Sequence, residues 1–233
     1  MKKQRIIIAA LSIILCHSGW SKFSYGLLAG GTFSTFSTGV DVTFTGANAS
    51  GLTPSGRFGY SMGVGTRIEE DNWSIEIDAL YTKRRMAWQG NIDMIAPTDD
   101  FRYRETYTMK QLEVPLIGFY HILTPKRVYR FGFGLYASYG LGKINYQREA
   151  SDVPGVVSSA NGDYSWGKIG FSRLNFGGLV AMGVDFKLTE TIRFTTDLRA
   201  QTTFTDIKNK LNPFFSGGKI GLLGVDLMAG ILF

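Results

Sequence analysis

The sequence predicts an all-β fold, namely an eight-stranded antiparallel up-and-down transmembrane β-barrel. Three observations support this fold class. Runs of alternating apolar residues recur about eight times in the 233 residues, and this period is typical of strands whose two faces meet different surroundings. The connections between the runs alternate between long and short. Nine charged residues within the runs all fall on the same, mixed face of their strands.

Residues 1–21 are predicted to be a cleavable signal peptide. Lys2, Lys3 and Arg5 precede an apolar stretch of ten residues, which is too short for a membrane anchor because spanning takes about 20. The barrel domain is expected to comprise residues 22–233. It contains no cysteine and has a net charge of +3, from 22 basic and 19 acidic residues. A disulfide framework is therefore excluded, and nucleic-acid binding loses its main support.

The first four predicted strands each have one largely apolar face. The second strand, for example, places Phe58, Tyr60, Met62 and Val64 on one side. These strands cover residues 23–36, 57–68, 72–84 and 107–120. Abundant glycine and β-branched residues favour strand over helix in all of them.

The last four predicted strands cover residues 129–143, 173–188, 192–203 and 219–233. The first of these has a continuous apolar face tipped by Tyr129 and Tyr139, as expected of a surface that faces lipid between interfacial aromatics. The last strand is apolar at every second position and ends on Phe233 without a polar tail. Such an ending suits a strand that closes a barrel, because closure removes the exposed edge.

The connection lengths predict short periplasmic turns and four long external loops, as in outer-membrane barrels. The short connections are residues 69–71, 121–128 and 189–191. The long connections are residues 37–56, 85–106, 144–172 and 204–218. We therefore expect an integral protein of the bacterial outer membrane, in contact with its lipid. The alternative is a soluble periplasmic sandwich, which gives no reason for this alternation.

The nine charged residues on the mixed face are expected to point into the barrel, because a base facing lipid would cost up to about 2–4 kcal/mol. They are Glu76, Asp78, Glu113, Arg130, Asp185, Arg193, Asp197, Arg199 and Asp226. An eight-stranded barrel is just wide enough to be filled by side chains. The favoured interpretation is a plugged interior crossed by ion pairs of Arg130, Arg193 and Arg199, and the alternative is a selective pore.

No catalytic, cofactor-binding or metal-binding residues are predicted. His121 is the only histidine after residue 21, and it is expected to be a surface residue of a short periplasmic turn. Asp99 and Asp100 have two interpretations, a contact with a cation and a solvated loop tip, and the solvated loop tip is favoured. The cluster Lys83–Arg85 lies where the third strand is expected to leave the membrane. It is interpreted either as a lipopolysaccharide-binding site or as an interfacial anchor. Pro115 predicts a bulge or an unpaired point within its strand.

Several motifs together resemble one family. They are Tyr25-Gly-Leu-Leu-Ala-Gly-Gly, Ile75-Glu-Ile-Asp-Ala-Leu-Tyr-Thr-Lys, Gln111-Leu-Glu-Val-Pro-Leu-Ile-Gly-Phe-Tyr and Phe131-Gly-Phe-Gly-Leu-Tyr-Ala-Ser-Tyr. On these stretches the chain resembles the PorT-like outer-membrane β-barrel family (outer membrane protein beta-barrel domain). The name-giving member of that family is implicated in type IX secretion. The resemblance therefore implies a setting in a secretion assembly.

The expected function is a non-enzymatic barrel with a structural or partner-docking role, in a type IX secretion-type assembly if the resemblance extends that far. One alternative is a narrow channel for small solutes. Another is a lipid-modifying barrel enzyme, which the single histidine disfavours. Phe233 resembles the recognition signal for barrel assembly, so the barrel-assembly machinery is an expected partner. Other envelope or secretion proteins are further candidate partners.

Overall fold

The computed structural model describes residues 22–37, 53–93, 100–153, 156–204 and 221–233. The predicted signal peptide and Asp99 lie outside these ranges. The described elements are β1 (Lys22–Ser37), β2 (Thr53–Glu70), β3 (Trp73–Asp93), β4 (Asp100–Leu123), β5 (Arg127–Val153), β6 (Val156–Tyr164), α2 (Trp166–Ile169), β7 (Leu174–Lys187), β8 (Arg193–Thr203) and β9 (Gly221–Leu232). No helix among these residues is long and apolar enough to cross a membrane.

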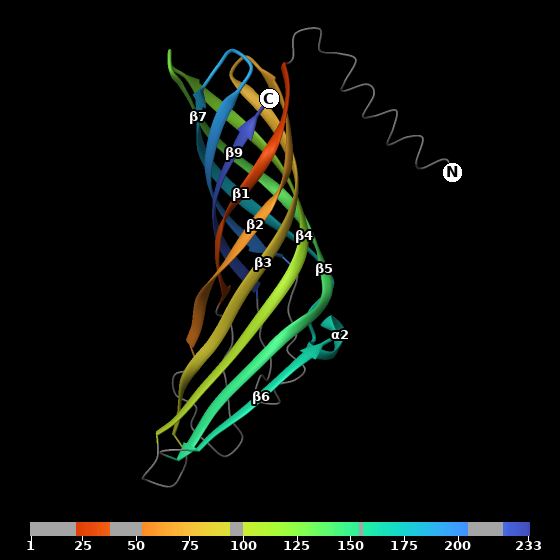
Figure 1. Ribbon diagram of the computed structural model, residues 1–233, viewed down its shortest axis with the longest axis vertical. Coiled ribbons are helices and arrows are strands. Elements are labelled where there is room, and N and C mark those ends of the chain that lie inside the picture. Colours follow the sequence, from red (N-terminus) through yellow and green to blue (C-terminus); the bar gives the residue numbers. More distant parts are fainter. Residues whose placement is uncertain (1–21, 38–52, 94–99, 154–155, 205–220) are drawn as a thin grey trace, which may run out of the picture.

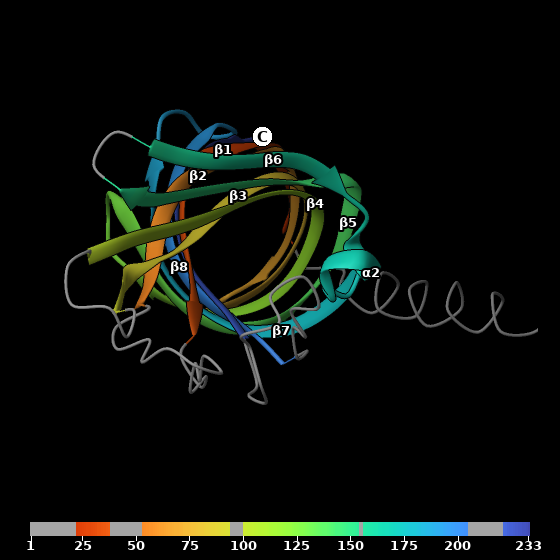
Figure 2. The same ribbon diagram turned by 90° about the horizontal axis from the view of Figure 1, so that it is seen from below.

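Eight of the strands form one closed antiparallel ring, which confirms the predicted fold class. Strands β1, β2, β3, β4 and β5 pair in this order, each with its neighbour in the sequence. Strand β5 also pairs with β7, β7 pairs with β8, and β8 pairs with β9. Pairing of β9 with β1 completes the ring, as the view along the barrel shows (Figure 2). Strand β6 lies outside the ring, and within the described residues it pairs with β5 alone.

The short turns and both chain ends of the described barrel lie at one end, which we call the turn end (Figure 1). Asp71 and Asn72 connect β2 to β3, and Asp71 has a positive φ of 38°. The backbones of Tyr25 and Phe233 exchange two hydrogen bonds of 2.8 and 3.2 Å there. Outer-membrane barrels have short turns on the periplasmic side, so the opposite end is the external end.

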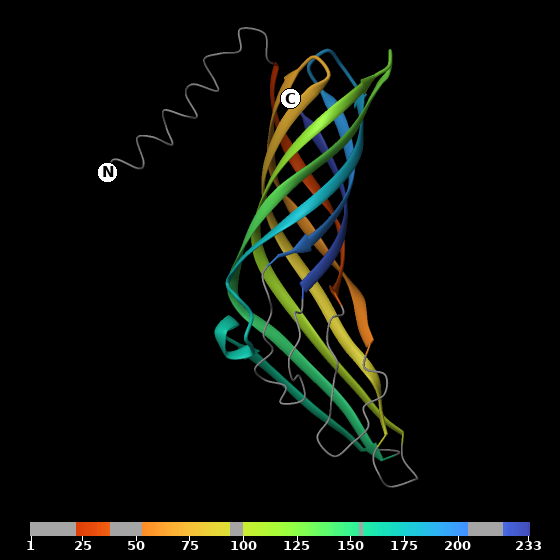
Figure 3. The ribbon, with the colours of Figure 1, turned by 180° about the vertical axis from the view of Figure 1, so that it is seen from behind.

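Strands β3, β4 and β5 continue past the ring at the external end and, with β6, form a four-stranded sheet that we call the extension (Figures 1 and 3). Pairing in the extension reaches Asp93 opposite Asp100 and Val153 opposite Val156. The prediction of loops over 85–106 and 144–172 is therefore wrong for most of both segments. The described part of the second segment also contains α2.

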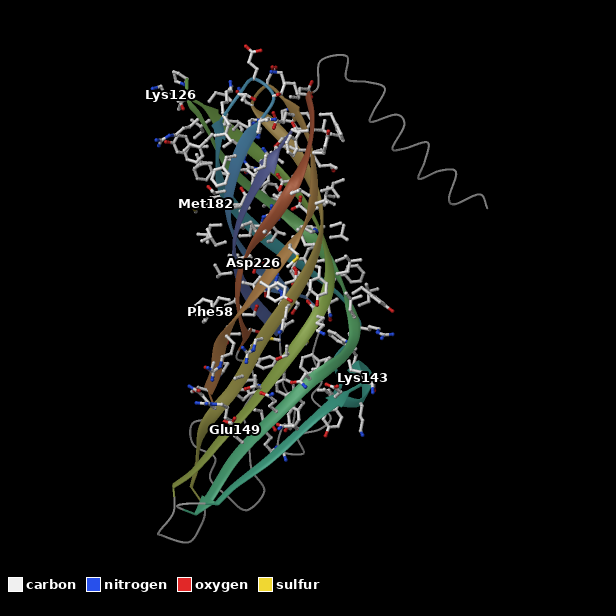
Figure 4. All side chains as sticks on the ribbon, viewed as in Figure 1. Phe58, Lys126, Lys143, Glu149, Met182 and Asp226 are labelled. Carbon is white, nitrogen blue, oxygen red and sulfur yellow. The ribbon has the colours of Figure 1, made fainter. Side chains whose placement is uncertain are left out.

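The two faces of the ring strands differ as predicted. Outward side chains are apolar and exposed, among them Phe58, Leu27, Phe133 and Leu227. The residues between them on each strand are buried inside the ring. Figure 4 shows Phe58 and Met182 on the outside of the wall. An apolar outer surface over a polar interior is the arrangement that lipid requires of a spanning barrel.

Two irregularities mark the wall between β3, β4 and β5. The β3–β4 ladder has no pairs between Ile77–Leu116 and Leu80–Glu113, but the register on either side is the same. Pro115 lies in this gap and has no N–H to donate, so it marks an unpaired point and not a bulge. A bulge follows between β4 and β5 beyond Lys110, where Gly142 adopts a φ of 60°. The extension begins at this bulge.

Candidate functional site

Glu76 lies at the centre of a buried group of charges inside the turn-end half of the ring. Its carboxylate accepts hydrogen bonds from three arginines: Arg67 at 2.7 and 2.9 Å, Arg130 at 3.2 Å and Arg199 at 2.6 Å. The three guanidinium groups come from β2, β5 and β8, and each arginine is at most 2% exposed. Because these bonds cross the lumen, they tie three parts of the ring wall together.

Three further carboxylates complete this group, which we call the turn-end charge cluster. Asp78 accepts a hydrogen bond of 2.6 Å from Arg199. Asp185 accepts one of 2.7 Å from Arg67, and Asp197 pairs with both Arg130 and Arg199. All three carboxylates are 1% exposed. Buried charges are tolerated only when they are paired and hydrogen-bonded. Every charged group of this cluster has at least one partner of opposite charge, although four of its buried atoms, among them Asp78 Oδ1 and Arg199 Nε, accept or donate no hydrogen bond.

Arg193 closes the cluster toward the turn end. It pairs with Glu69 at 2.7 and 2.8 Å and donates to the hydroxyl of Ser24 at 2.7 Å. The Arg193 side chain is 17% exposed, so it lies at the rim of the lumen.

A second buried group lies around Arg84 on β3. Its guanidinium group binds Glu113 through two hydrogen bonds of 2.7 and 2.9 Å, and Asp226 through two of 2.9 and 3.1 Å. The hydroxyl of Ser34 accepts a further bond of 2.9 Å. The expectation that Arg84 belongs to a surface cluster with Lys83 and Arg85 is wrong, because alternation along β3 turns Arg84 inward and its two neighbours outward.

The structure thus places eight of the nine predicted interior charges in buried positions and Arg193 at the rim. It divides them between two groups, with Glu113 and Asp226 around Arg84 and the others in the turn-end charge cluster. Sequence reasoning did not assign Arg67 and Arg84 to the interior. Both share the strand parity of inward neighbours, and this parity was the signal available in the sequence.

His121 is not the surface turn residue that the sequence predicted. It lies on β4 in phase with the inward residue Phe119 and is 5% exposed. Its Nε2 lies 2.8 Å from the hydroxyl oxygen of the buried Ser74. Within the described residues no carboxylate hydrogen-bonds to its ring, so the pair lacks the third member of a Ser-His-Asp triad. The same residues contain no group of three potential metal ligands.

An apolar cluster lies at the external end of the ring, and we call it the aromatic cap. Its buried members are Phe36, Met86, Trp88, Tyr107, Met109, Ile144, Tyr146, Trp166, Ile169, Phe171 and Leu222. The ring of Phe36 stacks on Trp88 with centroids 5.0 Å apart, and Phe171 lies 5.7 Å from Tyr107. Phe36 and Leu222 belong to the external ends of β1 and β9, so the cap covers the lumen at that end.

Helix α2 contributes to the cap through Trp166. A Cβ atom on Gly140 would lie 2.3 Å from the Trp166 ring, so only glycine permits this contact with β5. The indole N–H donates to the carbonyl of Gly142 at 3.2 Å. The segment between β6 and β7 is thereby held against β5.

Little open space remains between the Arg84 group and the cap. The cavity there has a volume of about 10 Å³ and is lined by Arg84, Gln111, Glu113, Leu222 and neighbouring residues. That is room for about one water molecule. The described interior therefore holds two charged groups and an apolar cap, with little space between the Arg84 group and the cap.

Glu105 forms a third buried polar centre, within the extension. It is 0% exposed and accepts hydrogen bonds from the hydroxyls of Tyr107 at 2.8 Å and Tyr146 at 2.6 Å. Arg148 donates at 3.1 and 3.3 Å. Burial and the nearby carboxylate raise the pKa of Tyr146, which keeps its hydroxyl protonated as a donor. This centre holds β4 to β5 outside the ring.

Replacing Glu105 with alanine should loosen the extension without opening the ring. Tyr107 and Tyr146 each lose a charge-assisted hydrogen bond, at a cost of about 1–3 kcal/mol per buried hydroxyl. Hydrogen exchange should therefore accelerate in the outer parts of β4 and β5 and stay unchanged in β8 and β9. Glu149→Ala is the matched control, since that side chain is 59% exposed and lies 3.8 Å from Arg104. Equal acceleration in both variants would contradict a special role for Glu105.

The comparisons with known proteins agree with this architecture. A family model described as outer membrane protein beta-barrel domain matches residues 17–209. A search of curated protein sequences returns no match to this chain.

Three solved structures are similar to the chain at low identity. The chain is similar to the attachment invasion locus protein of Yersinia pestis, at 12% identity and a TM-score of 0.39, over 91% of this chain and 99% of that one. Neisserial surface protein A is similar at 14% identity and a TM-score of 0.42, over 91% of this chain and 97% of that one. The outer membrane protein OprG of Pseudomonas aeruginosa is similar at 16% identity and a TM-score of 0.44, over 89% of this chain and 94% of that one. With a family model that spans most of its length, the chain belongs to the outer membrane protein beta-barrel domain family and is an integral protein of the bacterial outer membrane.

Proposed function

We propose that the protein is a non-enzymatic barrel that anchors a docking surface for partner proteins, and that the extension is this surface. The observation that carries the proposal is the contrast between a filled lumen and a wall that continues far beyond it. A spanning strand needs about 9–11 residues. Strands β3, β4 and β5 have 21, 24 and 27 residues, so about half of β3 and more than half of β4 and β5 is not needed for crossing the membrane.

The edge of the extension supports the same function. Within the described residues, β6 pairs with β5 and with no other strand, so one row of its backbone groups is free of ladder pairing. An open strand edge is a template on which an extended segment of another protein can pair. A partner that adds a strand to β6 would gain backbone hydrogen bonds without any change in the ring.

The two alternative functions have less support. A solute channel needs a continuous path, whereas the two charged groups, the aromatic cap and a cavity of about 10 Å³ occupy the described lumen. A lipid-modifying enzyme needs a nucleophile or base near the external rim, but the Ser74–His121 pair is buried at the turn end. The resemblance to PorT-like proteins adds the finer proposal that the docked partners belong to a type IX secretion-type assembly.

A photo-crosslinking side chain placed at Glu149 should capture a specific protein partner in living cells. Glu149 is exposed on the extension, and Lys126 at the turn end provides a matched exposed position (Figure 4). We expect a discrete adduct from Glu149 and none from Lys126, and the adduct should vanish when β6 is deleted. An adduct from Lys126 alone would move the docking surface to the periplasmic rim. Absence of adducts at both positions would contradict the proposal.

A further inference from the structure

Five basic residues gather where the apolar outer surface of the ring ends toward the external side. They lie on the neighbouring strands β3 to β5 and immediately before β7. We call this group the outer basic patch, and its members are Lys83, Arg85, Lys110, Lys143 and Arg173. Figure 4 shows Lys143 near the level at which the wall leaves the ring.

The lysines of the patch directly follow the lipid-facing residues of their strands. On β4 the exposed Leu112 is followed by Lys110 in the external direction. On β5 the outward positions after the exposed Tyr139 are Leu141 and then Lys143, and on β3 the outward position after Tyr81 is Lys83. The patch therefore lies at the boundary between the hydrocarbon region and the external headgroups, the level at which interfacial residues of spanning barrels are found.

The strand register brings two like charges directly together, because Lys83 lies opposite Lys110. Like charges in directly opposed positions destabilise a sheet. Within the described residues no carboxylate forms an ion pair with any member of the patch, whereas each buried arginine of the lumen has at least one carboxylate partner. The sheet thus keeps a repulsion that an external anion would relieve.

Among the residues that the structure describes, the patch occupies one half of the ring. Arg173 extends it, because its guanidinium group lies over the ring of Tyr139 and donates to the carbonyl of Gly142, next to Lys143. The external ends of β8, β9 and β1 present Thr202, Leu223 and Thr35 on the outside, and their described residues place no base there. A general anchoring belt would surround the barrel, whereas a binding site is expected on one side.

We propose that the outer basic patch binds the phosphate groups of an outer-leaflet glycolipid. The bases pair with the phosphates, and the acyl chains lie against the exposed apolar residues below them, such as Leu112 and Tyr139. A lipid is favoured over a soluble anion because the charged and apolar parts of the surface are continuous along the same strands. This site is independent of partner docking on the extension.

The test compares two triple variants of the full-length protein in detergent, each lacking three positive charges. One is Lys83→Gln, Lys110→Gln, Lys143→Gln in the patch. The other is Lys22→Gln, Lys126→Gln, Lys187→Gln, three exposed lysines at the turn end. The probe is purified lipid A that carries two phosphates. The patch variant should bind it on the order of 100-fold more weakly than the parent, and the turn-end variant about equally well.

Further arms distinguish the sources of phosphate. Dephosphorylated lipid A should bind the parent protein as weakly as lipid A with two phosphates binds the patch variant, and inorganic phosphate in excess should fail to displace the lipid. Equal weakening in both triple variants would overturn the proposal, because net charge alone would then explain binding. Displacement by inorganic phosphate would overturn the assignment to a lipid. Heat-modifiable migration on gels shows that both variants remain folded.

Discussion

Replacing Arg199 with methionine is expected to lower the free energy of unfolding of the barrel by about 3–5 kcal/mol. Arg199 is 2% exposed and pairs with Glu76, Asp78 and Asp197 at 2.6, 2.6 and 3.1 Å. Methionine fills a similar volume but leaves these carboxylates with less positive charge. A buried carboxylate without its partner is far more costly than the net gain from the original ion pair. Urea-driven unfolding from lipid vesicles measures the change.

Arg104→Met is the matched control. Arg104 also pairs with a carboxylate, Glu149, but its side chain is 49% exposed. An exposed ion pair contributes about 0–1 kcal/mol, so this variant should unfold close to the parent midpoint. A double variant, Arg199→Met with Asp78→Asn, should recover part of the loss, because one of the unpaired charges is removed. Equal stability of the two single variants would show that the turn-end charge cluster is not coupled to the integrity of the ring.

The membrane-spanning part of the fold could be predicted because lipid imposes a strict rule on the outer face. On β9 the outward residues Leu223, Val225 and Leu227 are apolar without exception, so Asp226 had to point inward. The structure places Asp226 there, 4% exposed and bound to Arg84. Strand identity, register parity and closure are all consequences of this one constraint.

The extension could not be predicted by the same rule, because the polarity of the two faces reverses outside the membrane. Met86 and Trp88 on the inward face of β3 are apolar, and Arg85, next to Met86, faces outward. A search for strands with an apolar outer face therefore ends near residue 84 and assigns the next residues of β3 to a loop. The burial of His121 at the other end escapes sequence reasoning for a related reason, because a polar residue near a turn is expected to be exposed.

The partners within the two charged groups were beyond the reach of sequence reasoning. Arg67 and Asp185 are separated by 118 residues, and Arg84 and Asp226 by 142. The alternation along each strand predicts that these side chains enter the lumen. The height along the barrel axis at which each one enters depends on the tilt and stagger of the strands. Small register differences change which residues meet across the ring, so pairing requires the three-dimensional structure.

Deleting Phe233 is expected to impair insertion of the barrel in cells more than it lowers the stability of the folded protein. The Phe233 ring is 46% exposed and lies 6.0 Å from the ring of Tyr25. A half-exposed phenylalanine contributes less than the roughly 1.5–3 kcal/mol of a fully buried side chain. The deletion also removes the two backbone bonds to Tyr25, at the fraying end of the β9–β1 ladder. We therefore expect a modest loss of stability after refolding into vesicles.

Recognition of Phe233 by the barrel-assembly machinery predicts a different result in cells, because insertion would then depend on the terminal residue itself. The inserted fraction of the Phe233 deletion, or of a variant with a charged tail appended, should fall further than that of any loop deletion. Tyr25→Ala is the control, because it removes the same ring contact and leaves the terminus intact. If Tyr25→Ala and the deletion reduced insertion equally, closure of the ring would explain the effect. A specific loss on deletion, with normal refolding into vesicles, can arise only from recognition of the terminus during assembly.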